Sequence, residues 1–419
     1  METNVVKVKL WGLDVGYVYW NSKKGVAIFE YESAFLKQGL DIAPLTMSAY
    51  SPRSQKQLPW EGDKNTLYQG LPPMIADSLP DKWGKSLFSA WIRDNKIPEK
   101  RVTPVDHLSF IGSRAMGALE YEPARIVGED SAFSVDVQRL YEFAKQVLND
   151  REAIVLNEKT SILWQDLVKI SSSPGGKRPK AIVAINKSTG EVVSGQGKIP
   201  DGFKNYVLKY DDNTAYPYAK LEYVYYLMAL DAGIVIMPSE LKTYDGKSHF
   251  LTERFDRIDN NKIHTQTLAA ISPTSESYED IFTVIRRLNL PYEDNRQQFL
   301  RMVFNVLARN VDDHSKNFAF CMNKKGEWRL SPAYDLTFSV DLGAPGYTNR
   351  HSLNINSKSE NITRQDLESV GLKNDIKDYK ILIDKVADSV AKFENLSIGL
   401  EIDKKLISQI KAEFVKLDI

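Results

Sequence analysis

Two polar side chains in the last third of the chain are spaced as phosphoryl transfer requires. Asp312 and Asn317 lie in the segment NVDDHSKNF, residues 310–318, with four residues between them. A kinase catalytic loop uses this spacing to place the aspartate against the incoming hydroxyl and the asparagine against a magnesium ion. Asp313 competes for the catalytic position, although its spacing to Asn317 is one residue shorter. A solvated polar loop has the same residue types, so both interpretations stay open.

Lys316 and Asp335 extend this candidate site. Lys316 lies in the same loop and could neutralise the γ-phosphate of ATP. Asp335 follows a predicted β-hairpin, with arms at 318–322 and 328–330, where a kinase places its metal-binding aspartate. No Phe-Gly follows it, so the motif differs from the eukaryotic one. The oxygen atoms of Asn317 and Asp335 suit Mg²⁺, whereas an aspartate of this kind taken alone is more commonly a turn or N-cap residue.

A lysine and a glutamate could hold the α- and β-phosphates. Lys209 lies in the predicted strand YVLKY, residues 206–210, and Glu222 lies near the start of a predicted helix over 218–232. A strand lysine paired with a helix glutamate fixes these phosphates in kinases. A lone lysine on an edge strand more commonly faces solvent.

The predicted strand FLTERF, residues 250–255, is the candidate adenine site. Backbone groups around Glu253 to Phe255 would contact the edge of the base, with apolar walls above and below. An ordinary core strand has the same composition. If a glycine loop is counted first, these segments occur in the order that a protein kinase uses. This shared order is a stronger signal than any one of the segments alone.

The segment SSSPGGKRPKA, residues 171–181, could cradle a phosphate. Gly175 and Gly176 permit positive φ, so successive amides can point at an anion. Positive charge comes from Lys177, Arg178 and Lys180. The segment is neither G-x-G-x-x-G nor a Walker A loop, and a plain turn is an equal interpretation. Phosphorylation in cis would disturb this loop and repel ATP, and the candidate acceptors are Ser171, Ser172 and Ser173.

The elements that must position these residues divide into a β-rich first half and a helical second half. Short β-rich runs are predicted at 6–10, 15–20 and 26–31. Helical periodicity is predicted at 77–94, 135–149, 218–232, 381–393 and 404–416. This layout predicts an α+β protein, and a bilobal enzyme with a cleft at the junction would fit it.

Composition narrows the class of protein. The 419 residues are 42% hydrophobic, enough for a large core or for two to three adjoining cores. Lysine plus arginine and aspartate plus glutamate both total 55, so a uniformly basic nucleic-acid binder is disfavoured. Cys321 is the only cysteine, which excludes an intramolecular disulfide and suits a reducing cytosol. With neither a secretory signal nor a bilayer-spanning stretch, a cytoplasmic protein without a membrane contact is expected.

These segments resemble the HipA family of bacterial toxin kinases. The matching segments are SSSPGGKRPKA, EYVYYLMALDAGI, TERFDR, HTQTLAA, NVDDHSKNFAF, SPAYDLTFS and HSLNIN, with LPDKWGKSLF and IGSRAMGAL nearer the N-terminus. The resemblance covers nearly the whole chain, and D-D-H-x-K-N-F followed by Tyr-Asp is its most specific element. It implies a bilobal protein-kinase-like fold with an added N-terminal subdomain over 1–125, a β-rich kinase lobe over 126–260 and a helical lobe over 261–419.

The resemblance implies an ATP-dependent serine/threonine protein kinase and assigns roles within it. Asp312 would be the catalytic aspartate, Asn317 and Asp335 would bind Mg²⁺, and Lys209 would contact the phosphates of ATP. The family also has an inhibitory autophosphorylation serine before its glycine loop, and by register Ser172 is the best match. Three serines, a proline and Gly-Gly-Lys depart from the best-known members, so the choice among the serines stays open.

The remaining implied contacts concern the nucleotide base and the partners. Glu253 and Phe255 would lie at the adenine, and His314 would help to position the nucleotide. Such toxins usually pair with a small helix-turn-helix antitoxin, HipB-like, that binds operator DNA, so contact with DNA would be indirect. The family's well-known target is an aminoacyl-tRNA synthetase, glutamyl-tRNA synthetase.

Two other functions are compatible with parts of the sequence. A small-molecule phosphotransferase of the aminoglycoside or choline kinase kind usually has a histidine just before the catalytic aspartate, whereas His314 follows Asp312 here. A catalytically weak corepressor, acting with a DNA-binding antitoxin, would be favoured by loss of a candidate catalytic residue. The four decisive candidates are all present, namely Lys209, Asp312, Asn317 and Asp335.

Overall fold

The N-terminal part of the chain forms a five-stranded antiparallel sheet. The computed structural model describes residues 5–80, 82–125, 132–149, 158–171, 178–211, 216–244, 246–343 and 349–417. The sheet has the order β4-β3-β2-β1-β5, with β1 Val5–Leu10, β2 Leu13–Asn21, β3 Val26–Tyr31, β4 Trp60–Glu61 and β5 Leu119–Glu122. Val6, Val8 and Leu10 are buried at alternate positions of β1, as a sheet with one core face requires. The strands predicted at the start of the chain are confirmed.

Helices connect this sheet to a second one. They are α1 Ser33–Leu36, α2 Pro52–Gln55, α3 Pro73–Ala76, α4 Lys82–Asp94, α5 Pro104–Ile111, α6 Val137–Asn149 and α7 Glu158–Ser171. Helix α5 packs on β1, β2 and β5, and α7 packs on α4, α6 and the second sheet. The helix predicted over 77–94 corresponds to α4, whose described part starts at Lys82, whereas Asp77 is the C-cap of α3. The residue before Pro80 is disfavoured in the helical region, which fits a break between the two helices.

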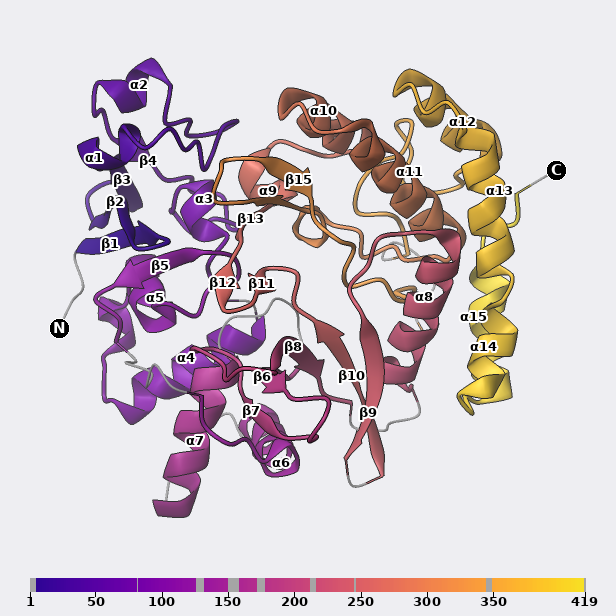
Figure 1. Cartoon of the computed structure of the whole chain (residues 1–419), viewed down its shortest axis with the longest axis horizontal. Helices are drawn as coiled ribbons and strands as arrows, with labels where there is room; N and C mark the ends of the chain where they lie inside the picture. The colour runs from indigo at the N-terminus through magenta and orange to yellow at the C-terminus, as the bar shows by residue number, and fades with distance from the viewer. Residues whose placement is uncertain are drawn as a thin grey trace.

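The second sheet carries the candidate phosphate-binding lysine. Its order is β7-β6-β8-β10-β9, with β6 Lys180–Ile185, β7 Val192–Ser194, β8 Lys204–Lys209, β9 Ser239–Tyr244 and β10 Lys247–Glu253. All six residues of β6 are buried, since this strand lies inside the sheet and α7 packs against it. Residues of both sheets belong to one hydrophobic core, and Figure 1 shows the two sheets as neighbours.

The C-terminal part is mainly helical. Its helices are α8 Tyr218–Ala232, α9 Leu268–Ile271, α10 Tyr278–Arg287, α11 Tyr292–Leu307, α12 Arg364–Lys373, α13 Tyr379–Val390, α14 Phe393–Gly399 and α15 Lys404–Glu413. Helix α13 packs on α8 and α11, and the helices α12 to α15 form one edge of the molecule in Figure 1. A small sheet of β13 His264–Thr267, β14 Ala319–Met322 and β15 Trp328–Leu330 lies toward the N-terminal sheet. The predicted α+β layout is confirmed.

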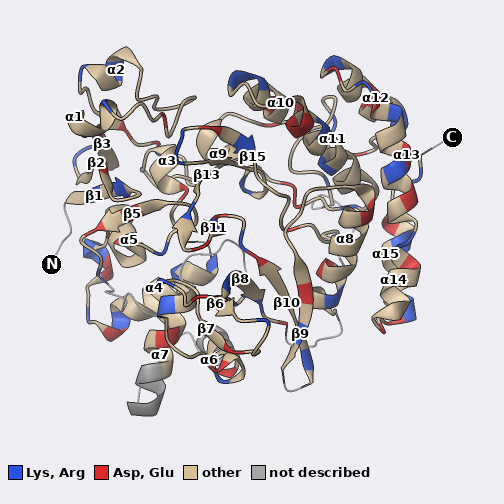
Figure 2. Cartoon of the chain, in the orientation of Figure 1, with Lys and Arg blue, Asp and Glu red and all other residues tan. Residues whose placement is uncertain are grey.

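Surface charge is mixed along this helical edge. Figure 2 shows lysine and arginine interspersed with aspartate and glutamate on helices α12 to α15. This mixture agrees with the equal totals of acidic and basic residues in the sequence. Among the helices of the described segments, none combines the length and the apolar character that crossing a bilayer demands.

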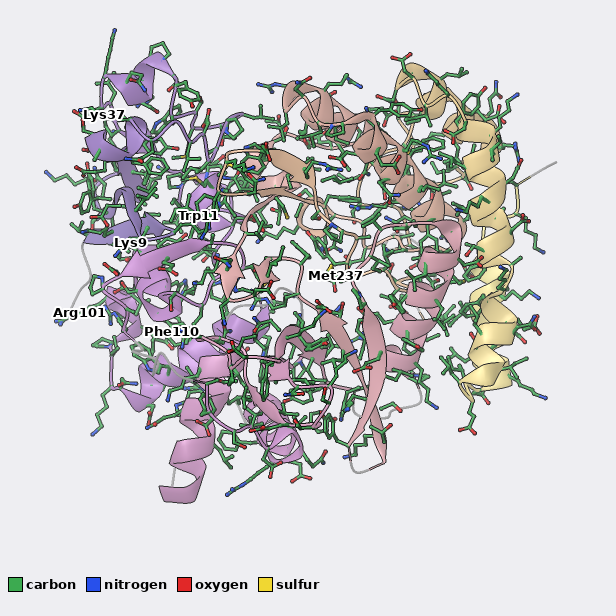
Figure 3. All side chains as sticks on the ribbon, in the orientation of Figure 1. Lys9, Trp11, Lys37, Arg101, Phe110 and Met237 are labelled. Atoms are coloured by element: carbon green, nitrogen blue, oxygen red, sulfur yellow. The ribbon has the colours of Figure 1, made fainter. Side chains whose placement is uncertain are left out.

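A buried ionic cluster ties the N-terminal sheet to the residues that follow β10. Asp256 is fully buried and accepts hydrogen bonds from Arg254, from Arg257 and from the Gly117 amide, the last at 2.7 Å. Arg257 also donates to the Gly117 carbonyl at 2.9 Å. Nearby, the Trp11 indole donates to the Lys262 carbonyl in β12 Asn261–Lys262, the partner of β11 Arg257–Ile258. Figure 3 shows Trp11 on the side of the N-terminal sheet that faces the rest of the molecule.

Changing Asp256 to asparagine is expected to lower the free energy of unfolding by about 3 kcal/mol, because two buried arginines lose their counter-charge. Urea denaturation followed by tryptophan fluorescence measures this change. Glu240→Gln is the control, since Glu240 pairs with Lys187 at the exposed surface and its loss should leave the midpoint unchanged. An Asp256→Asn midpoint equal to that of wild type would contradict a stabilising role for the cluster.

Candidate active site

Lys209 lies at the centre of the candidate site, between a helix glutamate and an aspartate. It is the last residue of β8, and its ammonium donates to Glu222 Oε1 of α8 at 2.5 Å. The same ammonium donates to Asp335 Oδ1. Strand β8 and helix α8 are separated by only a short connection, whereas Asp335 lies 126 residues further along the chain. The fold therefore brings together three residues that the sequence assigned to nucleotide and metal binding.

The three side chains influence one another's ionisation. Burial by itself would lower the pKa of Lys209, but the charges of Asp335 and Glu222 outweigh it and raise that pKa above its ordinary value. Burial raises the pKa of Glu222 against the opposing charge of Lys209. Burial would also raise the pKa of Asp335, but the positive charges of Lys209 and Lys180 outweigh it and lower that pKa. Lys209 and Asp335 are therefore both charged near neutral pH.

Asp335 is held in an unusual backbone conformation beside the loop of residues 310–317. Its φ is 53°, in the left-handed region that costs energy for a residue other than glycine. The preceding residue, Tyr334, donates its hydroxyl to the Lys316 carbonyl at 2.8 Å. The Tyr334 ring also stacks on Phe255, with ring centroids 5.6 Å apart. Tyr334 thereby joins the candidate metal site, the candidate catalytic loop and the candidate adenine strand.

The candidate catalytic loop presents Asp312 to solvent on a fixed backbone. Its side chain is 68% exposed, and its amide donates to Ser339 Oγ at 2.9 Å. Asn317 closes the loop, because its side-chain amide donates to the Asp312 carbonyl at 2.7 Å. His314 Nε2 lies 3.8 Å from Asp312 Oδ1. The exposed carboxylate is thus free to meet a hydroxyl group.

Asp313, the competing aspartate, points the other way into a buried network. It accepts hydrogen bonds from the Tyr278 hydroxyl and from the Ser352 amide, both at 2.7 Å. His351 Nδ1 also lies 2.7 Å from an Asp313 oxygen. Because the Asp313 side chain is fully buried and occupied by protein partners, it anchors the loop, and Asp312 is the aspartate with access to a substrate.

Some polar groups of the candidate adenine strand already pair with other groups of the protein. The Glu253 carboxylate pairs with Lys204 at 3.1 Å, and the Glu253 amide donates to the Pro238 carbonyl at 2.9 Å. The Phe255 ring is only partly buried and lies on Tyr334. Met237 precedes Pro238, and Figure 3 shows it near the centre of the molecule. The Phe255 ring is therefore an apolar group that could flank a base here.

The candidate glycine loop falls largely outside the described residues. Ser171 is the last residue of α7, and nothing beyond its backbone is described. The other residues of this prediction, Ser172, Ser173, Gly175, Gly176 and Lys177, lie outside the described residues. The next described residue is Arg178, two residues before β6.

From the sequence, Lys180 counted only as added positive charge, and its position beside Lys209 was not predicted. It is buried at the start of β6 and is paired in register with Lys209 of β8. Paired positions on neighbouring strands lie on the same face of a sheet. Two lysines therefore approach Asp335 from adjacent strands. KAIVAI shows no alternation of polar and apolar residues, and its register with YVLKY is a long-range property, so no local signal in the sequence indicates the position of Lys180.

Asn317 and Asp335 offer oxygen atoms of the kind that a hard cation prefers, with a bound ligand completing its coordination. Asn317 uses its amide nitrogen to bond Asp312, which leaves its oxygen for another partner, and Asp335 supplies a carboxylate. Oxygen atoms of this kind suit Mg²⁺, which usually also binds water and substrate phosphate. Within the described residues, no group of three or more His, Cys, Asp or Glu side chains could hold a metal by itself.

Comparisons with known proteins cover nearly the whole chain. The model of the HipA-like C-terminal domain matches residues 172–394, and that of the HipA N-terminal domain matches residues 6–122. A protein of Sinorhizobium fredii (strain NBRC 101917 / NGR234) named "Putative kinase Y4mE" is 22% identical over 225 residues. That alignment covers 46% of this chain and 52% of the relative, so this chain spans about half of the relative's length.

Among solved structures, HipA of the Shewanella oneidensis MR-1 toxin–antitoxin system is similar throughout. That structure is a complex with HipB and its operator DNA. The similarity covers 97% of this chain and 96% of that chain, with a TM-score of 0.67 and 14% sequence identity. Likeness at this identity concerns the fold, and the predicted bilobal, protein-kinase-like fold with an added N-terminal subdomain is confirmed.

Proposed function

Because the chain belongs to the HipA family, we propose that it is an ATP-dependent serine/threonine protein kinase, the toxin of a toxin–antitoxin pair. The observation that carries this proposal is the cluster of Lys209 with Glu222 and Asp335. This cluster lies beside a loop that exposes Asp312 and is linked to it through Tyr334. A positioned lysine, a metal-binding aspartate and an accessible catalytic carboxylate are the parts that phosphoryl transfer needs.

Each residue has a distinct role in the proposed reaction. Lys209, held by Glu222, contacts the α- and β-phosphates, and Lys180 adds a second positive charge on the same face. Asp312 orients the substrate hydroxyl toward the γ-phosphate and accepts its proton. Lys316 neutralises charge that develops on the transferred group.

The remaining predicted residues complete the nucleotide site. Asn317 and Asp335 would hold Mg²⁺, whose charge stabilises the β- and γ-phosphates. Backbone groups near Glu253 and the Phe255 ring contact the adenine. His314 helps to position the nucleotide, and its charge, when protonated, acts on Asp335.

The proposal also covers the regulation of the enzyme and its partners. The glycine loop at Gly175, Gly176 and Lys177 covers the phosphates, and phosphorylation in the run 171–173, with Ser172 the first candidate, switches the enzyme off. The solved HipA of Shewanella oneidensis is in a complex with HipB and its operator DNA, which supports a helix-turn-helix antitoxin as partner here. The substrate is a protein hydroxyl, with an aminoacyl-tRNA synthetase as the first candidate.

The domain division is also a proposal. It places an N-terminal subdomain over 1–125, a β-rich lobe over 126–260 and a helical lobe over 261–419. The second boundary is supported by β13, which starts at His264 and pairs with β14 of the helical part.

Phosphoproteomics after a short induction of the chain tests the proposed function. We expect new phosphoserine or phosphothreonine on a small set of host proteins and on the peptide that contains residues 171–173. Cells expressing Asp312→Asn at the same level are the matched control, and they should lack these sites. Equal phosphorylation in both cultures, or phosphate found only on small molecules, would overturn the proposal.

A further inference from the structure

A single hydroxyl group joins the segment after Asp335 to the candidate catalytic loop. Ser339 Oγ accepts hydrogen bonds from the Val311 amide at 2.7 Å and from the Asp312 amide at 2.9 Å. It donates its own proton to Asn310 Oδ1 at 3.3 Å. A serine hydroxyl has one donor and two acceptor positions, so this one is fully used by three successive residues of the loop.

Buried neighbours set the direction of these hydrogen bonds. The Asp313 carboxylate can only accept, and it takes the proton of the Tyr278 hydroxyl at 2.7 Å. The Tyr278 oxygen accepts from the side-chain nitrogen of Asn305 at 2.9 Å, and the side-chain oxygen of Asn305 accepts from the side-chain nitrogen of Asn310 at 3.0 Å. Asn310 Oδ1 is thereby left as an acceptor, so Ser339 donates to it. The Ser339 oxygen is then oriented to accept from the two backbone amides.

The segment between Tyr334 and Ser339 is fastened to the loop at both ends. Tyr334 donates its hydroxyl to the Lys316 carbonyl at 2.8 Å, and Ser339 binds the two amides near the other end of the loop. Asp335 lies between these two attachments, four residues before Ser339. Four residues span at most about 14 Å, so the Ser339 hydroxyl limits how far Asp312 and Asp335 can move apart.

The position of the Asp312 carboxylate depends on this backbone. The side chain is 68% exposed, so its placement relies on the main chain that carries it. Asn317 holds the Asp312 carbonyl at 2.7 Å, and Ser339 holds the Asp312 amide. These two contacts fix the peptide groups on either side of the Cα atom from which the carboxylate projects.

We propose that Ser339 is a positioning residue that aligns the catalytic carboxylate of Asp312 with Asp335. This inference rests on the roles of both aspartates in the proposed function. Phosphoryl transfer needs the substrate hydroxyl, oriented by one carboxylate, in line with a phosphate held through the other. A fixed connection between the two keeps this alignment before the substrate binds, so less ordering remains for the reaction step.

Ser339→Ala removes the hydroxyl and leaves the lysine that contacts the phosphates in place. We expect kcat to fall about tenfold, the size of one lost hydrogen bond, with the KM for ATP unchanged because Lys209 and Glu222 are not touched. Ser331→Ala is the matched control, since the Ser331 hydroxyl donates to the Pro332 carbonyl beside it and its loss should leave kcat at the wild-type value. An unchanged kcat in Ser339→Ala, or an equal fall in Ser331→Ala, would overturn the inference.

Hydrogen exchange supplies a readout that needs no catalytic activity. Exchange of the Val311 and Asp312 amides is measured on the whole chain without nucleotide, by mass spectrometry with residue-level fragmentation. We expect exchange about tenfold faster in Ser339→Ala, because both amides lose their acceptor, and unchanged exchange in Ser331→Ala. Equal rates in wild type and Ser339→Ala overturn the inference even if the chain is an active kinase. Faster exchange in a chain that transfers no phosphate sustains the anchor at Ser339 and refutes the kinase.

Ser339→Thr separates positioning from a purely structural role of the hydroxyl. Threonine keeps the hydroxyl group, so it can restore the hydrogen bonds to both amides. We expect kcat and the protection of the two amides to change together across the wild type, Ser339→Thr and Ser339→Ala. Protection restored in Ser339→Thr without recovery of kcat would refute the positioning role.

Discussion

Asp335→Asn is expected to lower the rate of phosphoryl transfer by roughly 10³-fold. The asparagine has nearly the same size but lacks the negative charge that pairs with Lys209 and that suits Mg²⁺. Transfer from labelled ATP, measured over a range of Mg²⁺ concentrations, should show both a lower maximal rate and a higher Mg²⁺ requirement. The variant should remain folded, because the Lys209–Glu222 pair persists.

The comparison variant for this experiment is Asp231→Asn. Asp231 also lies in an ion pair, with Lys392 at 2.7 Å, but on the exposed side of α8. Its loss should leave the rate and the Mg²⁺ dependence at wild-type values. A wild-type rate for Asp335→Asn would remove this aspartate from the site and with it the proposed arrangement of the metal.

Asp312→Asn should lower kcat by about 10³-fold while ATP binds with its normal affinity. The Asp312 side chain is exposed, so nothing in the fold depends on its charge. Its backbone is held independently by Ser339 and Asn317, so the asparagine should occupy the same place. Single-turnover transfer measures the chemical step, and isothermal titration with ATP measures binding.

Asp313→Asn is the matched variant, because it makes the same change one residue away. Here the main expected effect is on folding, with a loss of about 2 kcal/mol in the free energy of unfolding, since one of the two carboxylate oxygens that serve Tyr278, His351 and the Ser352 amide becomes an NH2 donor. If Asp313→Asn instead abolished transfer without loss of stability, and Asp312→Asn did not, the assignment of the catalytic aspartate would be reversed.

Short-range elements could be predicted from the sequence. The helix predicted over 218–232 coincides with α8, because a run of good helix formers ends at Gly233, whose φ of 83° caps it. The hairpin predicted with arms at 318–322 and 328–330 corresponds to β14 and β15, since the residues that form its turn are adjacent in the sequence. The strand predicted over 250–255 is observed as Lys247–Glu253: pairing with β9 extends its start, and Phe255 lies beyond its end.

Long-range contacts could not be predicted in this way. The hydrogen bonds from Thr267 to Asp77 span 190 residues, and the bond from the Gly117 amide to Asp256 spans 139. Neither aspartate lies in a motif whose spacing indicates chemistry. Their partners depend on how the N-terminal sheet docks on the rest of the chain, which no local pattern encodes.

The sequence by itself determined which chemical groups this protein has and their order along the chain. The spacing to Asn317 favoured Asp312 over Asp313, but spacing does not show which of two adjacent side chains reaches solvent. Only the tertiary structure shows their surroundings: Asp313 is buried among a tyrosine, a histidine and an amide that satisfy its carboxylate, whereas Asp312 is exposed. The physical reason is that a buried carboxylate must be hydrogen-bonded by the protein, which leaves only its exposed neighbour free to bind a substrate.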